Sequence, residues 1–270
     1  MITKNKLYIN KNYSYFCLHM FIKSSYLIIL IFLSQLIFAQ STTQAIESGN
    51  DPNVLYRNEM SFGVFAHSRG FGVNFMRAKH VTSTRKRLME IEALNLKHPK
   101  EIKVSNQNDN SKRFVYGKIN SILLFRAGIG YQTTIYKRAD RKSVEIRSSF
   151  YLGGNLTFAK PNYILVYRQS NLGTKYQESV KYDPNKYSID SISGKGPLID
   201  GLGELKVYPG FYAKANLSFE YAPYSNKVKA IETGVIFDYY PKALPIMAHN
   251  PAENFIITLY VGFVFGKKWF

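Results

Sequence analysis

Cysteine is almost missing from this chain of 270 residues, in which Cys17 is the only one. Cys17 lies in a segment that we predict to be removed, so we expect the remaining chain to contain no disulfide and to use no thiol chemistry. The same observation excludes a lipid-modified cysteine behind the cleavage point, and with it a bacterial lipoprotein.

Acidic residues are also scarce. The chain holds 18 Asp and Glu against 36 Lys and Arg, a formal net charge of +18, and no acidic residue precedes Glu47. Removing the predicted leader takes away four lysines and no acid, which lowers the net charge to +14. We expect no nucleic-acid partner for an exported chain. The acidic partner that we predict is outer-membrane lipid, including lipopolysaccharide, with its phosphorylated headgroups.

Residues 1–39 have the pattern of a secretory signal peptide. A lysine-rich start is followed by an apolar core over residues 26–33, and Ala39 offers a cleavage site. The alternative is a transmembrane anchor, but the apolar run is shorter than the roughly 18–20 residues that a spanning helix needs. We therefore predict a signal peptide cleaved near Ala39, an N-terminal tail over residues 40–57 and one domain over residues 58–270.

No run beyond Ala39 is long and apolar enough for a spanning helix, so a membrane location would require a closed barrel. The end of the chain alternates strictly between two faces, which predicts a strand. Its apolar face reads Phe255, Ile257, Leu259, Val261, Phe263 and Phe265. This stretch is long enough to cross a bilayer as a tilted strand, which takes about 9–11 residues. Such a strand is typical of the end of outer-membrane barrels, which the barrel-assembly machinery reads. We predict an assembly signal formed by Phe263, Phe265, Trp269 and Phe270.

The same alternation recurs along the chain and predicts an all-β fold, a transmembrane antiparallel up-and-down β-barrel with long extracellular loops. We predict strands at residues 60–67, 71–76, 118–136, 144–158, 211–221, 231–239 and 255–270. Single-chain barrels of bacteria have an even number of strands, so we predict eight. The eighth is expected either in the tail before Asn58 or inside the connection over residues 168–204. Residues 77–96 are interpreted as a hairpin arm that leaves the membrane, because residues 77–87 are too basic to face lipid.

The lengths of the connections predict an orientation. Placing the C-terminus in the periplasm puts three short turns there, at residues 68–72, 138–142 and 223–227. Three longer segments then face outward, at residues 97–113, 168–204 and 241–253. Short periplasmic turns and long outer loops are typical of these barrels.

Opposite the apolar stripes, polar residues of mixed charge predict a packed polar barrel interior, because a barrel of eight strands is just filled by side chains. The predicted interior residues are Arg126, Gln132, Glu145, Arg147, Asn155, Lys214, Asn216, Glu220, Glu232 and Asp238. Glycines on the same face would make room for the longer side chains. The alternative is a soluble sandwich or lipocalin, in which the apolar face would point inward.

A basic run at Arg85, Lys86 and Arg87 is a candidate contact for lipid headgroups on the outer side, and a solvated hairpin is the alternative.

The histidines do not indicate a catalytic site. Ser68 and the preceding His67 would point to opposite faces of a strand, so they cannot form a nucleophile–base pair. His98 and His249 fall in predicted outer loops. We predict no catalytic residues, no metal site and no cofactor, since metal-ligand spacings and phosphate-binding glycine loops are lacking.

Four short patches resemble the small outer-membrane β-barrel proteins of Bacteroidetes-type bacteria. They are Lys118-Ile-Asn-Ser, Phe158-Ala-Lys-Pro-Asn-Tyr, Tyr208-Pro-Gly-Phe-Tyr-Ala-Lys and Phe265-Gly-Lys-Lys-Trp-Phe. The resemblance implies a barrel of the general kind that includes porin-like proteins and barrel subunits of secretion and gliding machinery. It implies no catalytic residues.

Three functions follow as hypotheses. The first is a non-enzymatic barrel of the Gram-negative outer membrane with a structural or accessory role, as a subunit of an envelope secretion or assembly complex whose proteins are its partners. The second is a narrow porin-like channel for ions or small solutes. The third is a lipid-modifying barrel enzyme using His98 and His249.

Overall fold

The computed structural model describes residues 57–105, 113–138, 143–170, 175–222, 226–248 and 250–270. The predicted signal peptide and nearly all of the predicted tail lie outside these residues, so both stay predictions. The described residues belong to one compact unit that spans residues 50–270. Their helices are two short 3₁₀ segments, Ile189–Ser191 and Leu202–Glu204, and neither has the length or apolar character needed to traverse a bilayer.

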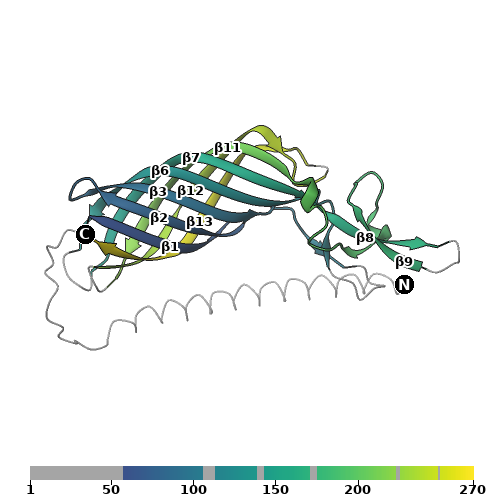
Figure 1. Cartoon of the computed structure of the whole chain (residues 1–270), viewed down its shortest axis with the longest axis horizontal. Helices are drawn as coiled ribbons and strands as arrows, with labels where there is room; N and C mark the ends of the chain where they lie inside the picture. Colours follow the sequence, from purple (N-terminus) through teal and green to yellow (C-terminus); the bar gives the residue numbers. More distant parts are fainter. Residues whose placement is uncertain (1–56, 106–112, 139–142, 171–174, 223–225, 249) are drawn as a thin grey trace, which may run out of the picture. The chain divides into compact units, whose positions relative to one another are not determined.

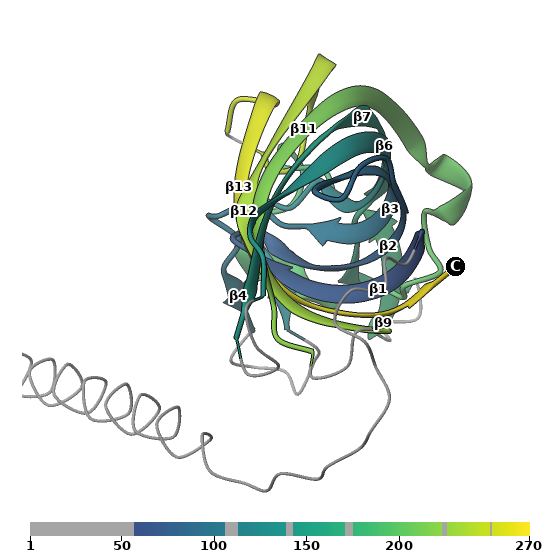
Figure 2. The same cartoon turned by 90° about the vertical axis from the view of Figure 1, so that its left-hand side faces the viewer.

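Eight antiparallel strands form a closed barrel, which confirms the predicted fold class (Figure 1). The strands are β1 (Asn58–His67), β2 (Gly70–His80), β3 (Arg85–Leu96), β6 (Asn120–Tyr136), β7 (Glu145–Pro161), β11 (Lys206–Glu220), β12 (Lys227–Leu244) and β13 (Glu253–Trp269). Each pairs with its neighbour in chain order, and β1 pairs with β13 to complete the ring seen in Figure 2. Closure pairs every edge strand, so the barrel presents no open row of backbone donors and acceptors.

The two ends of the barrel differ in their connections. At the end where Asn58 pairs with Trp269, which we name the terminal end, the turns at residues 81–84, 137–144 and 221–226 are short. At the opposite end, which we name the loop end, three of the four connections are longer, at residues 97–119, 162–205 and 245–252.

The fourth connection at the loop end is a tight turn between β1 and β2. It is followed by Gly70, whose φ of +152° suits glycine. A Cβ at Gly70 would also lie 2.5 Å from the backbone oxygen of Asn95, so the close approach of β3 demands glycine there.

The eighth strand is β3, and the sequence-based placement of it was wrong. The tail and the long connection contribute no barrel strand among the described residues, whereas Arg85–Leu96 pairs with β2 on one side and β6 on the other. The basic run from Arg77 to Arg87 misled the interpretation because it was treated as one surface. A turn at residues 81–84 divides it, and alternate side chains of each strand point to opposite faces.

Inserting this strand also corrects the orientation of the first turn. The connection at residues 68–69 lies at the loop end, not at the terminal end with the turns at residues 137–144 and 221–226. The predicted grouping of the other two short turns and of the three long connections agrees with the strand order.

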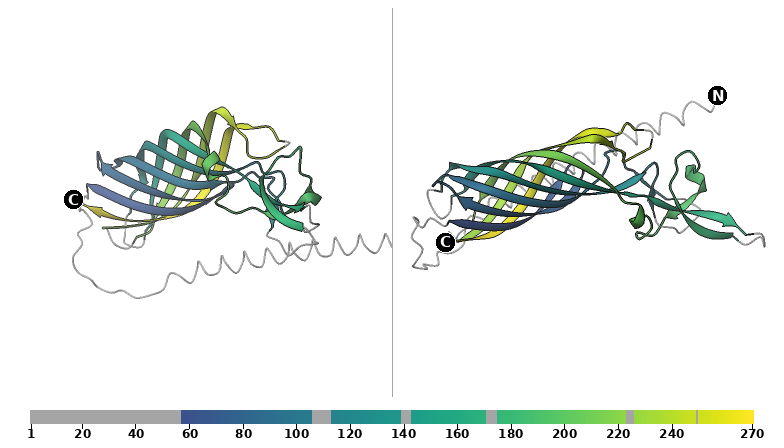
Figure 3. Two further views of the ribbon diagram at one scale, coloured as in Figure 1. Left: turned by 45° about the vertical axis from the view of Figure 1, so that its right-hand side comes forward. Right: turned by 45° about the horizontal axis from the view of Figure 1, so that its top comes forward.

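The long connection after β7 forms a small sheet of its own. Strands β8 (Tyr163–Gln169), β9 (Lys175–Lys181) and β10 (Ile192–Lys195) pair in the order β10-β8-β9, and we name this the projecting sheet (Figure 3). A two-stranded piece, β4 (Lys103–Val104) with β5 (Phe114–Val115), lies beside it. Phe114 packs with Ile164, Val166, Tyr182 and Ile192 in one apolar cluster, which joins the two loops of the loop end.

Candidate functional site: a filled barrel interior and a projecting sheet

The outer wall of the barrel is apolar. Every strand contributes large apolar side chains that point outward and stay exposed, among them Phe62, Phe75, Ile91, Ile129, Leu152, Phe211, Phe237 and Leu259. An apolar surface that runs round the whole molecule is far larger than the patches a soluble monomer leaves open. Together with a polar interior, it is the arrangement of a barrel whose wall faces lipid.

The middle of the barrel is crossed by ion pairs. Lys214 on β11 donates to Glu90 at 2.8 Å and to Glu92 at 2.7 Å, both on β3. Since β7 and β6 separate β11 from β3 in the ring, these bonds span the lumen and do not run along the wall. The side chain of Lys214 is 0 % exposed, so this cation has no access to bulk solvent.

Arg126 forms a second crossing. Its guanidinium donates from Nε and Nη2 to the two oxygens of Asp238 at 2.9 and 2.6 Å, and from Nη1 to Glu92 at 2.8 Å. Asn155 adds a third donor to Asp238 at 2.9 Å. Because Glu92 accepts from both Arg126 and Lys214, the two crossings form one network, which we name the central network (Glu90, Glu92, Arg126, Lys214 and Asp238).

Aromatic rings pack against the cations of this network. Lys214 Nζ lies 5.1 Å from the ring centroid of Tyr151 and 4.7 Å from that of Tyr260, and the Arg126 guanidinium lies 5.7 Å from Tyr212. These distances fall within the range of cation–π attraction. The Tyr212 ring fits because β6 and β7 carry glycine beside it: a Cβ at Gly128 would lie 2.4 Å from the Tyr212 hydroxyl.

A separate ionic cluster fills the terminal end. Arg147 pairs with Glu145, Glu220 and Glu59, while Lys86 also pairs with Glu59. Lys268 approaches Glu220 at 2.5 Å. Three cations meet three carboxylates here, so the buried charges can neutralise one another, as a low-dielectric interior requires.

The loop end of the lumen is closed by apolar packing. A buried cluster joins Leu96, Ile122, Ala159, Tyr208, Tyr240, Leu244, Ile246 and Ile256, and Met247 packs against it. These residues come from six barrel strands and from the connection between β12 and β13. The lumen is therefore occupied along its length by an ionic cluster, the central network and an apolar layer.

Nine of the ten residues predicted for the interior are buried, and Glu145 is partly exposed. Their ion-pair partners include residues outside the predicted set. The acidic partners of Lys214 are Glu90 and Glu92, and Glu59 holds both Lys86 and Arg147. Sequence reasoning missed Glu90 and Glu92 because β3 was assigned outside the barrel, and Glu59 because the first predicted strand began at residue 60. The available signal was the alternation of Met89 and Ile91 with Glu90 and Glu92, apolar outward and acidic inward.

Lys86 corrects the predicted headgroup contact. Its side chain points into the lumen, is 3 % exposed and pairs with Glu59, so it cannot meet lipid. Arg85 and Arg87 are exposed, as predicted for a contact surface, but they lie at the terminal end and not at the loop end. The four residues of the predicted assembly signal are all exposed. Phe263 and Phe265 lie in the apolar wall, Trp269 ends β13, and Phe270 follows the strand. Their role in assembly stays a prediction.

The histidines lie apart from the lumen networks. His67 lies at the loop end beside the turn at residues 68–69, and its Nε2 is 3.1 Å from the backbone oxygen of Asn95. His98 Nε2 lies 3.6 Å from Glu253, whose carboxylate also binds Arg69. His249 lies outside the described residues. Within the described parts of the chain, no group of His, Cys, Asp and Glu has the arrangement of a metal site.

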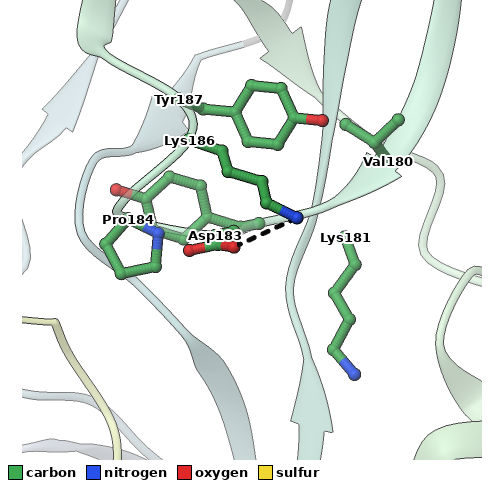
Figure 4. Close-up of a pocket in the computed structure, with 7 residues that line it drawn as sticks. Val180, Lys181, Asp183, Pro184, Lys186 and Tyr187 are labelled. Carbon is green, nitrogen blue, oxygen red and sulfur yellow. Dashed lines mark ion pairs between the residues drawn. The ribbon is translucent and has the colours of Figure 1, made fainter.

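The projecting sheet carries a shallow hollow where β9 ends. It has a volume of about 400 Å³ and is lined by Val180, Lys181, Tyr182, Asp183, Pro184, Lys186 and Tyr187 (Figure 4). Lys186 and Asp183 form an ion pair of 3.7 Å across it, and the lysine side chain is largely exposed. Burial raises the pKa of the Tyr182 hydroxyl, which accepts from the backbone N–H of Gly117 at 3.2 Å. The hollow therefore presents charged and aromatic groups to solvent, without a buried polar group aimed into it.

Comparisons with solved structures return small outer-membrane barrels. The chain aligns with Ail, the attachment invasion locus protein of Yersinia pestis, at 10 % identity and a TM-score of 0.37, over 80 % of this chain and 99 % of that one. It aligns with neisserial surface protein A at 9 % identity and a TM-score of 0.38, over 79 % and 97 %. The barrel domain of Pseudomonas aeruginosa OprF gives 8 % identity and a TM-score of 0.32, over 78 % and 99 %.

At these values the likeness is one of general architecture, and the fold assignment above comes from the strand pairing of this chain. No protein-family model matches the sequence, and no curated protein has a significant sequence match to it.

Proposed function

We propose that this chain is a non-conducting, non-enzymatic barrel of the Gram-negative outer membrane that acts as an anchor for its projecting sheet, with a structural or accessory role in an envelope complex. The observation that carries the proposal is the filled lumen within an apolar wall. Ion pairs from Lys214 and Arg126 cross the barrel, and the apolar cluster covers the loop end.

An outer-membrane location is supported by the barrel itself. Only helices and closed barrels satisfy their backbone hydrogen bonds in lipid, and this chain closes its sheet completely. The short turns at the terminal end and the longer connections at the loop end fit a periplasmic and an extracellular end. In that orientation the projecting sheet lies on the extracellular side, where it provides a solvent-exposed surface for a binding partner. The Bacteroidetes-type source stays a prediction from the four short patches.

Planar-bilayer recording tests the non-conducting barrel. The folded protein, identified by heat-modifiable migration on gels, is expected to add no single-channel steps above a protein-free bilayer. Discrete conductance from the folded form would overturn this part of the proposal and favour the narrow channel. A positive control is a variant that removes both crossings, Arg126→Ser with Lys214→Ser, in which polar voids replace the bridges and conductance is expected if the variant folds.

The accessory role is tested by cross-linking on native cells. A photo-reactive side chain at Tyr176 of β9, which is exposed, is expected to capture one reproducible envelope protein, while the same group at Leu152 in the lipid-facing wall captures none of it. Identical products from both positions, or none from Tyr176, would contradict a recognition role for the projecting sheet.

A further inference from the structure

The terminal end of the barrel wall carries a one-sided belt of cations. Five neighbouring strands of the ring, β3, β2, β1, β13 and β12, form this side of the barrel, and all of them except β1 contribute a cation. The belt consists of Arg77, Lys79, Arg85, Arg87, Lys229 and Lys267, all exposed, and we name it the rim belt.

Acidic side chains do not face this belt. Glu59, Glu90, Glu92 and Glu232 are the carboxylates on the same strands nearest to it, and all of them point into the lumen. None of the six belt cations forms an ion pair with another described residue. The belt therefore keeps its full positive charge toward its surroundings.

The other side of the barrel is different at the same level. The outward residues of β6, β7 and β11 near the terminal end are uncharged, namely Thr133, Ile135, Ser148 and Phe219. The rim belt thus lies on four strands, whereas the strand residues of β6, β7 and β11 offer no outward cation at this level. On that side, Lys137 is exposed at the start of the turn that follows β6.

The direction of the side chains identifies the partner chemistry. Arg77 and Lys79 continue the outward stripe of Phe75 at two-residue spacing, and Arg87 continues that of Met89. The cations therefore project radially from the wall at the level where its apolar band ends. In a bilayer that level holds the lipid headgroups, and long basic side chains reach them while their stems lie against the apolar boundary. Trp269, partly exposed in the same rim, suits this interface as well.

We propose that the rim belt binds the phosphate groups of anionic phospholipids in the leaflet at the terminal end, so that the barrel gathers anionic lipid along one side. The inference rests on the proposed membrane location. It replaces the outer-side contact expected from Arg85, Lys86 and Arg87 by a larger surface on the opposite leaflet that excludes Lys86.

Spin-labelled lipids test the proposal. The full-length mature chain is reconstituted into phosphatidylcholine vesicles, and the motionally restricted fraction is compared for labelled phosphatidylglycerol and labelled phosphatidylcholine. We expect at least about threefold preference for the anionic lipid at low ionic strength, declining at high salt as the charges are screened. The variant with all six belt residues changed to Gln is expected to lose this preference.

A matched control removes the same charge elsewhere. It changes six exposed lysines outside the rim to Gln: Lys97, Lys103, Lys175, Lys195, Lys206 and Lys242. This variant is expected to keep the wild-type preference. Equal association of both lipids with the wild type, or an equal loss in both variants, would overturn the proposal. Failure of the wild type to insert into vesicles at all, seen by flotation, would instead count against the membrane location.

Discussion

The barrel interior and the projecting sheet contain ion pairs of nearly the same length in opposite environments. Lys214 and Glu92 are 2.7 Å apart with both side chains 0 % exposed, whereas Arg168 and Glu178 are 2.8 Å apart with side chains 52 % and 44 % exposed. Distance alone would rank the two pairs as equals. The loss of stability on replacing one partner of the pair differs, because water solvates the remaining charge when it is exposed and cannot reach it when it is buried.

This contrast also separates the proposed roles of the two regions. The charged side chains of the interior form ion pairs with one another, and these pairs fix the packing of the lumen. The charges of the projecting sheet face solvent, where they can exchange partners. Four predictions sharpen the comparison, beginning with the largest effect.

Replacing Lys214 should damage the barrel most. Lys214→Met leaves Glu90 and Glu92 buried without their shared cation, and we expect a loss of about 3–5 kcal/mol in the free energy of unfolding. Urea unfolding in detergent micelles, followed by tryptophan fluorescence, measures it. Lys206→Met, an exposed lysine on the same strand, is the control and should change stability by less than about 0.5 kcal/mol. Equal effects of the two substitutions would mean that the central network is not buried as described.

Two adjacent glycines on β7 test the packing around the network. A Cβ at Gly153 would lie 2.2 Å from the backbone oxygen of Ala127, whereas a Cβ at Gly154 meets nothing closer than 3.8 Å. We expect Gly153→Ala to cost about 1–3 kcal/mol through overpacking, and Gly154→Ala to be close to neutral. The same unfolding assay compares them, and a reversed order would place the inward and outward faces of β7 the wrong way round.

The exposed pair of the projecting sheet should contribute little. A double-mutant cycle on Arg168→Ala and Glu178→Ala is expected to give a coupling of about 0.2–1 kcal/mol that shrinks with added salt. Hydrogen exchange of the β8 and β9 amides reports local stability without unfolding the barrel. A coupling as large as that of the central network would remove the distinction between the two regions.

The smallest expected effect is a pH dependence at Glu204. Hydrogen bonds from Lys181 and from Tyr163, the latter 2.7 Å long, lower the pKa of its carboxyl. A lowered pKa means that the contact is complete above the ordinary carboxyl range and is lost as the pH falls through the lowered value. NMR of the Tyr163 ring should therefore change in acid in the wild type. Glu204→Gln should show no such transition, and an unaltered acid transition in this variant would assign it to another group.

Much of the fold follows from the sequence because alternation is a local property. The stripe from Phe255 to Phe265 predicts an outward apolar face without knowledge of any neighbour, and the same holds for the other six predicted strands. The strand β3 was not predicted as a barrel strand because its basic start was treated as a single surface, although the side chains of Lys86 and Arg87 point to opposite faces.

The contacts of the interior could not be predicted in this way. Lys214 and its partner Glu90 are separated by 124 positions, and nothing in the spacing of either strand states that they meet across the lumen. The pairing depends on the order of the strands around the ring and on their register. Both are set by all eight strands together, so one missing strand removed two of the buried carboxylates, Glu90 and Glu92, from the predicted interior.

Site-directed spin labelling of the outer wall tests the central claim, that lipid bathes the apolar face while the lumen is filled. Nitroxides are attached through Leu152→Cys and Leu259→Cys, whose native side chains are exposed and point away from the lumen. In reconstituted vesicles both labels should be accessible to molecular oxygen and shielded from a water-soluble nickel chelate. Ready access of the chelate to these positions in the folded protein would contradict the account.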